Sequence, residues 1–338
     1  MAKYLGDLNA RARGLRTHLL SSSELERLAG AASLPALQRE LSSLGFVASD
    51  SRATPASLEK SIRHHTAEQM RVLDRWCGDR RRLVFSVLFE DEDRRSIQRI
   101  LRGAEQGVAS EARMAGLVPT ASLSERALFT LASQPTPADV VRMLLLWSHP
   151  FGPPLVEAAS RAHPSLFELE IALQRAFARR ASMRAREGGP HLVEYVGQVI
   201  DLMNAWSALL HFAERDPKLV DLTFIEGGQW LTRPVFEKLM GVSTREEVEK
   251  GLAWELRGSA LAPVFRQSVD EVAALESAAL VAQIDWQKRS MRIDPSSAAP
   301  VIGFVIELRA QALSLRRIIW GIALRAPAAL IQGEVVLK

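Results

Sequence analysis

The chain has 338 residues, of which 47% are apolar and 24% are charged, so it can form real hydrophobic cores and is not a disordered protein. Its 43 basic and 39 acidic residues leave a net charge of +4, which is too small an excess to indicate nucleic-acid binding by itself. The single cysteine, Cys77, excludes an intrachain disulfide and a cysteine-based metal site, and favours a reducing compartment. We expect Cys77 to fill a core.

Nearly the whole chain is predicted to be helical, because Ala, Leu, Glu and Arg dominate it and alternating β-branched runs are scarce. A first helix is expected over residues 4–20. Two long helical stretches follow. One runs over about 57–103 and is expected to split near Gly78 or Asp91. The other runs over about 156–186, with Pro164 marking an N-terminal boundary. Breaks are expected where Pro and Gly cluster, at 51–55, 135–137, 149–154, 188–190, 227–228 and 294–300.

No membrane-targeting segment is expected. Residues 1–16 carry charge throughout and lack the apolar region of a signal peptide. No segment reaches the ~18–20 unbroken apolar residues of a membrane helix. The best candidate, 318–331, is interrupted by Arg325 and Pro327. We therefore expect any work at a membrane to depend on a partner.

One pattern occurs nearly three times, at a step of about 105 residues. Each copy has five apolar positions and one Ser or Thr. The copies are Leu20, Leu25, Leu28, Ser33, Leu37 and Leu41; Leu123, Leu128, Leu131, Thr136, Val140 and Leu144; and Leu231, Phe236, Leu239, Thr244, Val248 and Leu252. A hydroxyl residue ahead of apolar positions spaced by four predicts a helix N-cap followed by a buried face.

A second pattern repeats at nearly the same step. Its copies are Asp93, Ser96, Ile97 and Leu101; Asp201, Asn204, Ala205 and Leu209; and Gln311, Ser314, Leu315 and Ile319. We predict an all-α protein of three similar helical units, at 1–107, 108–215 and 216–338. The third copy lacks the turn that follows the other two. The N-terminal helix begins the chain at the equivalent position of the repeat, and we expect it to supply the missing piece. The chain is therefore predicted to close into a pseudo-three-fold, funnel-like arrangement.

The repeated polar residues are expected to be structural. Asp93 and Asp201 correspond to Gln311, a change that a catalytic acid tolerates poorly, so a hydrogen bond or cap between helices is the expected role. The pair Gly227 and Gly228 is expected to serve turn geometry rather than phosphate binding. None of the seven histidines has a metal-ligand spacing, and phosphate-loop and serine-nucleophile motifs are absent. The sequence predicts no catalytic residue, cofactor or metal.

Residues 90–93 read Glu-Asp-Glu-Asp and precede two arginines. They loosely resemble the aspartate-rich motifs of helical terpenoid enzymes, but the spacing differs and no partner motif exists. We expect a solvated helix start, with the acids at the positive end of the helix dipole.

Arginines cluster at helical spacings and can line single helix faces. These faces are interpreted either as solvated and paired with nearby acids, or as docking surfaces for an acidic protein. The candidate docking residues are Arg13, Arg94, Arg95, Arg99, Arg102, Arg316 and Arg317. Nucleic acid is less favoured, because no helix-turn-helix or aromatic stacking pattern accompanies them. Charge reversal at Arg94 and Arg99 is expected to weaken partner binding without unfolding the protein.

Several segments together resemble the C subunit of V/A-type rotary ATPases, which is similar to subunit d of the vacuolar pump. The segments, spread over almost the whole chain, are 4–20, 93–102, 199–204, 224–231 and 300–321. Ser96 and Ser314 stand where the family has Asn, which marks a divergent member.

The resemblance implies three similar helical domains at the cytoplasmic face of a membrane rotor. Such a subunit is peripheral and non-catalytic, one per complex. It would link the central shaft subunits to the proteolipid ring, so that torque passes between ATP chemistry and proton or sodium transport. Two alternatives stay open, namely a generic helical adaptor for acidic protein partners and an all-helical prenyl-transfer enzyme. The enzyme would need a paired acidic motif.

Overall fold

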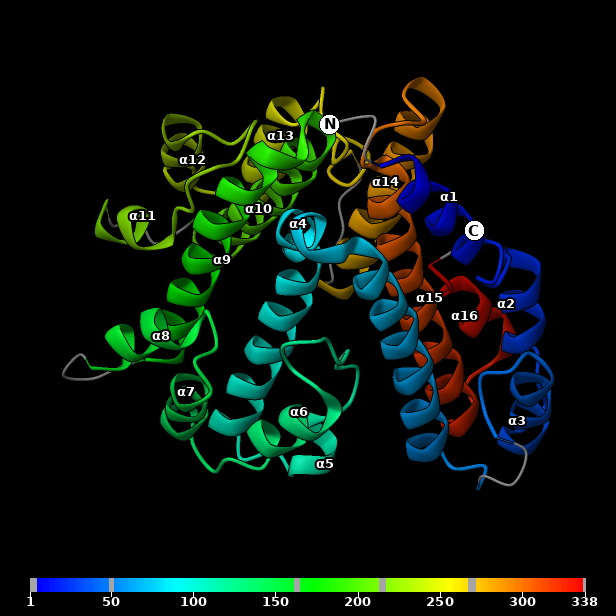
Figure 1. The fold of residues 1–338 in the computed structure, drawn as a ribbon. Helices are drawn as coiled ribbons and strands as arrows, with labels where there is room; N and C mark the ends of the chain where they lie inside the picture. Colours follow the sequence, from blue (N-terminus) through cyan, green and yellow to red (C-terminus); the bar gives the residue numbers. More distant parts are fainter. Residues whose placement is uncertain (1–4, 49–51, 161–164, 213–216, 267–271, 337–338) are drawn as a thin grey trace.

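The computed structural model describes residues 5–48, 52–160, 165–212, 217–266 and 272–336. Regular structure within these ranges is helical and includes no strand, so the all-α prediction is confirmed (Figure 1). The helices are α1 (Gly6–Arg16), α2 (Ser22–Ala29), α3 (Leu34–Ser43), α4 (Pro55–Glu105), α5 (Ser110–Arg113), α6 (Glu125–Ala132), α7 (Pro137–Leu146), α8 (Gly152–Ala159), α9 (Leu166–Gly188), α10 (Pro190–His211), α11 (Pro217–Thr223), α12 (Arg233–Met240), α13 (Arg245–Glu255), α14 (Val272–Ile293), α15 (Ala299–Ala323) and α16 (Ala328–Gly333).

Long helical segments form the frame of the molecule, and two of the breaks in it occur at glycines. Helix α4 is interrupted at Gly78, where φ is 63° and ψ is 176°, and α9 passes into α10 at Gly189, where φ is 90° and ψ is 178°. Glycine suits this left-handed region because it has no Cβ. The predicted split near Gly78 is confirmed, and the chain stays helical through Asp91. Helix α4 packs against α9 and α15, and α14 packs against α15 (Figure 1).

Three pairs of short helices, α2–α3, α6–α7 and α12–α13, carry the first repeated pattern. The hydroxyls of Ser33, Thr136 and Thr244 accept hydrogen bonds from backbone N–H groups in the first turns of α3, α7 and α13. The predicted N-caps are therefore confirmed. The apolar positions of all three copies are buried, which confirms the predicted buried faces.

Each short pair packs on a long helix: α6–α7 on α4, α12–α13 on α10, and α2–α3 on α15. Polar side chains of the second pattern fix these attachments. Asp93 accepts hydrogen bonds from the hydroxyls of Thr120, at 2.5 Å, and Ser122. Asp201 accepts from three consecutive backbone N–H groups at 229–231, and the shortest of these bonds, from Leu231, is 2.9 Å. In both cases the carboxylate anchors the turn that leads into a short pair.

The turn at 225–231 is held by two further residues of the pattern. The Asn204 side chain donates to the Ile225 carbonyl and accepts from the Ile225 N–H, both at 2.9 Å. Gly227 has φ of 109°, and a Cβ on Gly228 would collide with the Asp201 carboxylate. The double glycine thus lets the turn approach Asp201 closely.

The N-terminal segment lies against α15, the last of the long helices. The Leu20 N–H donates to the Gln311 side-chain oxygen at 2.7 Å, as the Leu231 N–H does to Asp201. Helix α1 packs on α15, where Arg16 forms a bidentate ion pair with Glu307 at 2.6 and 2.7 Å. This helix is shorter than the expected 4–20, and Tyr4 lies outside the described residues. The closed three-fold arrangement and the divisions at 107/108 and 215/216 stay predictions.

The predicted boundary at Pro164 lies outside the described residues, and α9 begins at Leu166 with Ser165 as its N-cap. Cys77 is buried in the main core, as expected, and this burial raises the pKa of its thiol to about 12. Within the described ranges, no helix combines the length and apolar character needed to cross a membrane.

Candidate functional site

The acidic run at 90–93 lies in the interior of α4, not at a solvated helix start. All four side chains are buried, and Asp91 is 0% exposed. The expectation of solvated acids is therefore wrong. The reason is tertiary: this part of α4 packs against α9 and α15, and both helices supply arginines to the acids.

Asp91 is the centre of a buried ion network. Its carboxylate accepts from Arg94 at 2.6 Å, Arg95 at 3.2 Å and Arg309 at 3.0 Å. Burial by itself would raise the pKa of Asp91, but Arg95, Arg94 and Arg309 together hold it well below its usual range. The network therefore stays ionised and ties α4 to α15.

The neighbouring acids are held in the same way. Glu90 forms a bidentate ion pair with Arg180 of α9, at 2.8 and 2.9 Å. Glu92 forms an ion pair with Arg309. Asp93 is held by the Thr120 and Ser122 hydroxyls of the loop before α6, so each acid of the run has a partner within the subunit.

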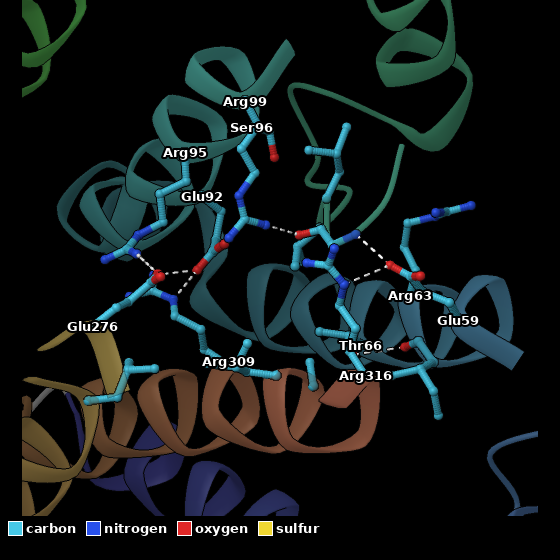
Figure 2. Close-up of a pocket in the computed structure, with 17 residues that line it drawn as sticks. Glu59, Arg63, Thr66, Glu92, Arg95, Ser96, Arg99, Glu276, Arg309 and Arg316 are labelled. Carbon is cyan, nitrogen blue, oxygen red and sulfur yellow. Dashed lines mark hydrogen bonds and ion pairs between the residues drawn. The ribbon is translucent and has the colours of Figure 1, made fainter. Parts of the chain in front are cut away.

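A narrow cavity of about 70 Å³ lies beside this network, between the two segments of α4, helices α14 and α15, and the loop at 116–118. Figure 2 shows Glu92, Arg95, Arg99, Glu276 and Arg309 towards one end of it and Glu59, Arg63 and Arg316 towards the other, with the Arg99 side chain extending toward Arg316. Its charged lining residues are Glu59, Arg63, Glu92, Arg95, Arg99, Glu276, Arg309 and Arg316. Five cations therefore face three carboxylates.

Gly116 forms one rim of the narrow cavity. Its N–H donates to Glu59 at 2.7 Å, and its carbonyl accepts from Arg99 at 2.5 Å. Glu59 also forms an ion pair with Arg316, at 3.2 Å, and accepts from the Trp320 indole at 2.9 Å. These contacts bring α4, α15 and the 116–118 loop together.

Replacing Gly116 by Ala is expected to lower the free energy of unfolding by about 1–2 kcal/mol, because its φ of 68° is unfavourable for a residue with a Cβ. The new Cβ would also push against the Arg99 and Arg316 guanidiniums. Urea denaturation measures the change. Gly107→Ala is the matched control, since Gly107 has φ of 65° with no atom near its Cβ position. A smaller loss for Gly116→Ala than for the control would contradict the crowding.

A wide cavity of about 460 Å³ adjoins the narrow one, between α4, α9, α10 and α14. The two cavities share Arg95, Arg99, Glu276 and Leu280. The wide cavity combines basic groups of α4 with apolar side chains of α10. The apolar residues of α10 include Leu202, Trp206 and Leu210, of which Leu210 is 64% exposed. Such a mixture of apolar and basic groups suits protein recognition.

The structure separates the predicted docking arginines into groups. Arg95, Arg99 and Arg102 line the wide cavity, although Arg102 is paired with Glu170 at 2.5 Å. Arg316 lines the narrow cavity.

Two of the arginines lie outside both cavity linings and bind within the subunit. Arg13 donates to the Pro295 carbonyl at 2.7 Å. Arg317 donates to the Ser277 hydroxyl at 2.7 Å and to the Glu334 carbonyl at 2.9 Å.

The prediction for Arg94 needs a correction, because its side chain is buried. Although it borders the wide cavity, only 7% of its side chain is exposed. It pairs with Asp91 and lies 5.3 Å from the centre of the Phe177 ring. Charge reversal there would bury a second acid beside Asp91, so the expectation that the fold would survive it is withdrawn.

Sequence reasoning missed four charged residues of the narrow-cavity lining, Glu59, Arg63, Glu276 and Arg309. They come from distant segments and belong to none of the repeated patterns. Among the described residues, no group of three or more His, Cys, Asp or Glu is placed to hold a metal ion.

Comparison with known sequences identifies the family. No curated protein matches the chain. A family model for the ATP synthase (C/AC39) subunit matches residues 8–334, a range that runs from α1 past the end of α16 and includes both cavities. The chain therefore belongs to the ATP synthase (C/AC39) subunit family, a subunit family of V/A-type ATPases.

Proposed function

We propose that this protein is the non-catalytic rotor adaptor of a V/A-type ATPase or ATP synthase. It joins the central shaft subunits to the proteolipid ring, one copy per complex, at the cytoplasmic face of the membrane. Torque then passes through it between ATP chemistry and proton or sodium transport. Membership of the family supports a place in this complex, and the wide cavity supports the proposed contact with the shaft.

The wide cavity is the observation that carries this proposal. Its walls are long helices that pack on one another, and the ion pairs of Glu90 and Asp91 link α4 to α9 and α15. A part that transmits torque must resist deformation, and close packing with satisfied polar networks provides that resistance. The partly exposed Trp206 and the exposed Leu210 give the shaft an apolar contact inside a basic rim.

The repeated attachments favour a position on the rotation axis. Asp93, Asp201 and Gln311 each accept a hydrogen bond from the segment that leads into a short helix pair. Three similar units around a centre would present similar surfaces in three directions. We therefore propose the pseudo-three-fold arrangement, with units near 1–107, 108–215 and 216–338, as the geometry of the adaptor.

Leu210→Glu is expected to weaken binding of the purified shaft by roughly 10-fold or more, because it places a charge at an apolar contact. Isothermal titration calorimetry with the whole subunit measures the affinity. Leu146→Glu is the matched control, since Leu146 is 72% exposed on α7 and lies outside the lining of both cavities. Equal affinities of the two variants would remove the wide cavity as the shaft site, and no binding by the wild type would refute the adaptor role.

A further inference from the structure

We propose that the narrow cavity receives an acidic side chain of the shaft, whose carboxylate binds between Arg99 and Arg316. This inference rests on the proposed function and narrows it to one contact. Three observations support it: the charge balance of the narrow cavity, the short distance between the Arg99 and Arg316 guanidiniums, and the size and position of the cavity.

The charges of the lining do not cancel. Glu92 pairs with Arg309, Glu276 with Arg95 at 3.4 Å, and Glu59 with Arg316 at 3.2 Å. Arg63 pairs with Glu125, which lies outside the lining.

Arg99 differs from these four arginines. Over the described ranges it has no carboxylate at ion-pair distance, and the Gly116 carbonyl accepts its hydrogen bond. Among the described residues, Arg99 is therefore the one cation of the lining without a carboxylate partner.

Arg99 and Arg316 converge over Gly116. Their Nη1 atoms are each closer than 3.0 Å to the position that a Cβ on Gly116 would occupy, so they are at most about 6 Å apart. Arg99 stays exposed to the cavity, yet the surrounding protein desolvates it and lowers its pKa, and the nearby Arg316 and Arg95 act in the same direction. A carboxylate between the two guanidiniums would accept from both and relieve their repulsion.

Arg309 supplies a third donor in the same lining. Its side chain is 10% exposed, and its Nη1 is buried with no hydrogen-bond partner within the described parts of the chain. Buried donors in folded proteins nearly always have a partner. An oxyanion in this cavity would give Arg309 the acceptor that the isolated subunit does not supply.

The size of the cavity restricts the occupant. A space of about 70 Å³ suits a side-chain tip or a small oxyanion rather than a whole peptide segment. The neighbouring wide cavity is several times larger and shares Arg95 and Arg99 with it. A shaft segment in the wide cavity could therefore extend one Asp or Glu side chain past Arg99 into the narrow cavity.

The test is calorimetric titration of the purified shaft into the whole subunit carrying Arg99→Gln or Arg316→Gln. Each change is expected to weaken binding by roughly 10- to 100-fold. The matched control is Arg102→Gln, which removes the same charge one turn further along α4, where Arg102 lines only the wide cavity. It is expected to weaken binding clearly less than Arg99→Gln does, because Arg102 is already paired with Glu170.

The folding of each variant is checked by its denaturation midpoint. Arg316→Gln leaves Glu59 without its ion pair, so Arg99→Gln decides the outcome if Arg316→Gln is destabilised. Equal effects of Arg99→Gln and Arg102→Gln, with normal wild-type binding, would overturn the acidic contact and leave the adaptor role standing. Absence of wild-type binding would overturn both.

A competition experiment with inorganic phosphate, at constant ionic strength, provides a second test. Phosphate should compete with the shaft for the wild type, and this competition should disappear in Arg99→Gln. Phosphate that binds the free subunit through Arg99 without reducing shaft affinity would show that the cavity takes a free anion, which contradicts a side chain of the shaft as its occupant.

Discussion

Replacing Asp91 by Asn is expected to lower the free energy of unfolding by about 3–5 kcal/mol, which is the range for breaking a buried ion pair. Asp91 is fully buried, and Arg94, Arg95 and Arg309 all direct donors at it. The amide keeps the size of the side chain but removes the negative charge. Three guanidiniums would then share a poorly solvated site with too few acids, and one of the ion pairs between α4 and α15 would be lost.

Denaturant unfolding monitored by circular dichroism measures this loss. Glu68→Gln is the matched control, since Glu68 lies on the same helix and pairs with Arg71 three residues later, as Asp91 pairs with Arg94. Both side chains of the control pair are 44% exposed, so its removal should change stability by less than about 1 kcal/mol. Similar losses in the two variants would show that burial does not strengthen the Asp91 network.

The low pKa of Asp91 gives the same network a pH dependence. Because the folded-state pKa lies below the ordinary value of 3.8, the contribution of Asp91 is present above about pH 4 and is lost as the pH falls further. The stability difference between the wild type and Asp91→Asn should therefore shrink as the pH falls below about 4. A difference that grows on acidification would contradict an ionised Asp91.

Local features of the fold could be predicted from the sequence, because they depend on neighbouring residues. The caps at Ser33, Thr136 and Thr244 and the break at Gly78 need only side-chain chemistry within one turn and a tolerated positive φ. The repeat added longer-range information, since equivalent positions such as Leu231 and Leu20 make equivalent hydrogen bonds.

The burial of the acidic run could not be predicted in the same way. Whether Asp91 faces solvent or protein depends on Arg309, which lies more than half the chain away and belongs to no repeated pattern. A dense cluster of acids usually indicates a solvated face, since an unpaired buried charge is very unfavourable. Here long-range pairing with α9 and α15 overrides that expectation.

The arginines of α4 were recognised as candidates, but their different surroundings follow from helix geometry. Arg95, Arg99 and Arg102 are spaced by four and three residues and therefore share one face, whereas Arg94 is turned by about 100° from Arg95. Helical periodicity alone is thus enough to distinguish Arg94 from the other three. The acids that complete the narrow cavity, Glu59 and Glu276, required the packing of α4 and α14 around it.

Leu8→Asp is expected to detach α1 from α15 and to lower the free energy of unfolding by about 4 kcal/mol or more, because it loses a buried Leu and buries a charge. Leu8 is 0% exposed in the main core, on the helix whose Arg16 binds Glu307. Ala10→Asp is the matched control, since Ala10 is exposed on the same helix.

Hydrogen exchange followed by mass spectrometry separates local from global effects. In Leu8→Asp the amides of α1 and the Leu20 N–H should lose protection, because the Gln311 bond depends on the N-terminal segment lying against α15. In Ala10→Asp they should stay protected. If Leu8→Asp kept its α1 protection and its unfolding midpoint, the N-terminal helix would not be what completes the third copy of the repeat, and the proposed three-fold closure would lose its main support.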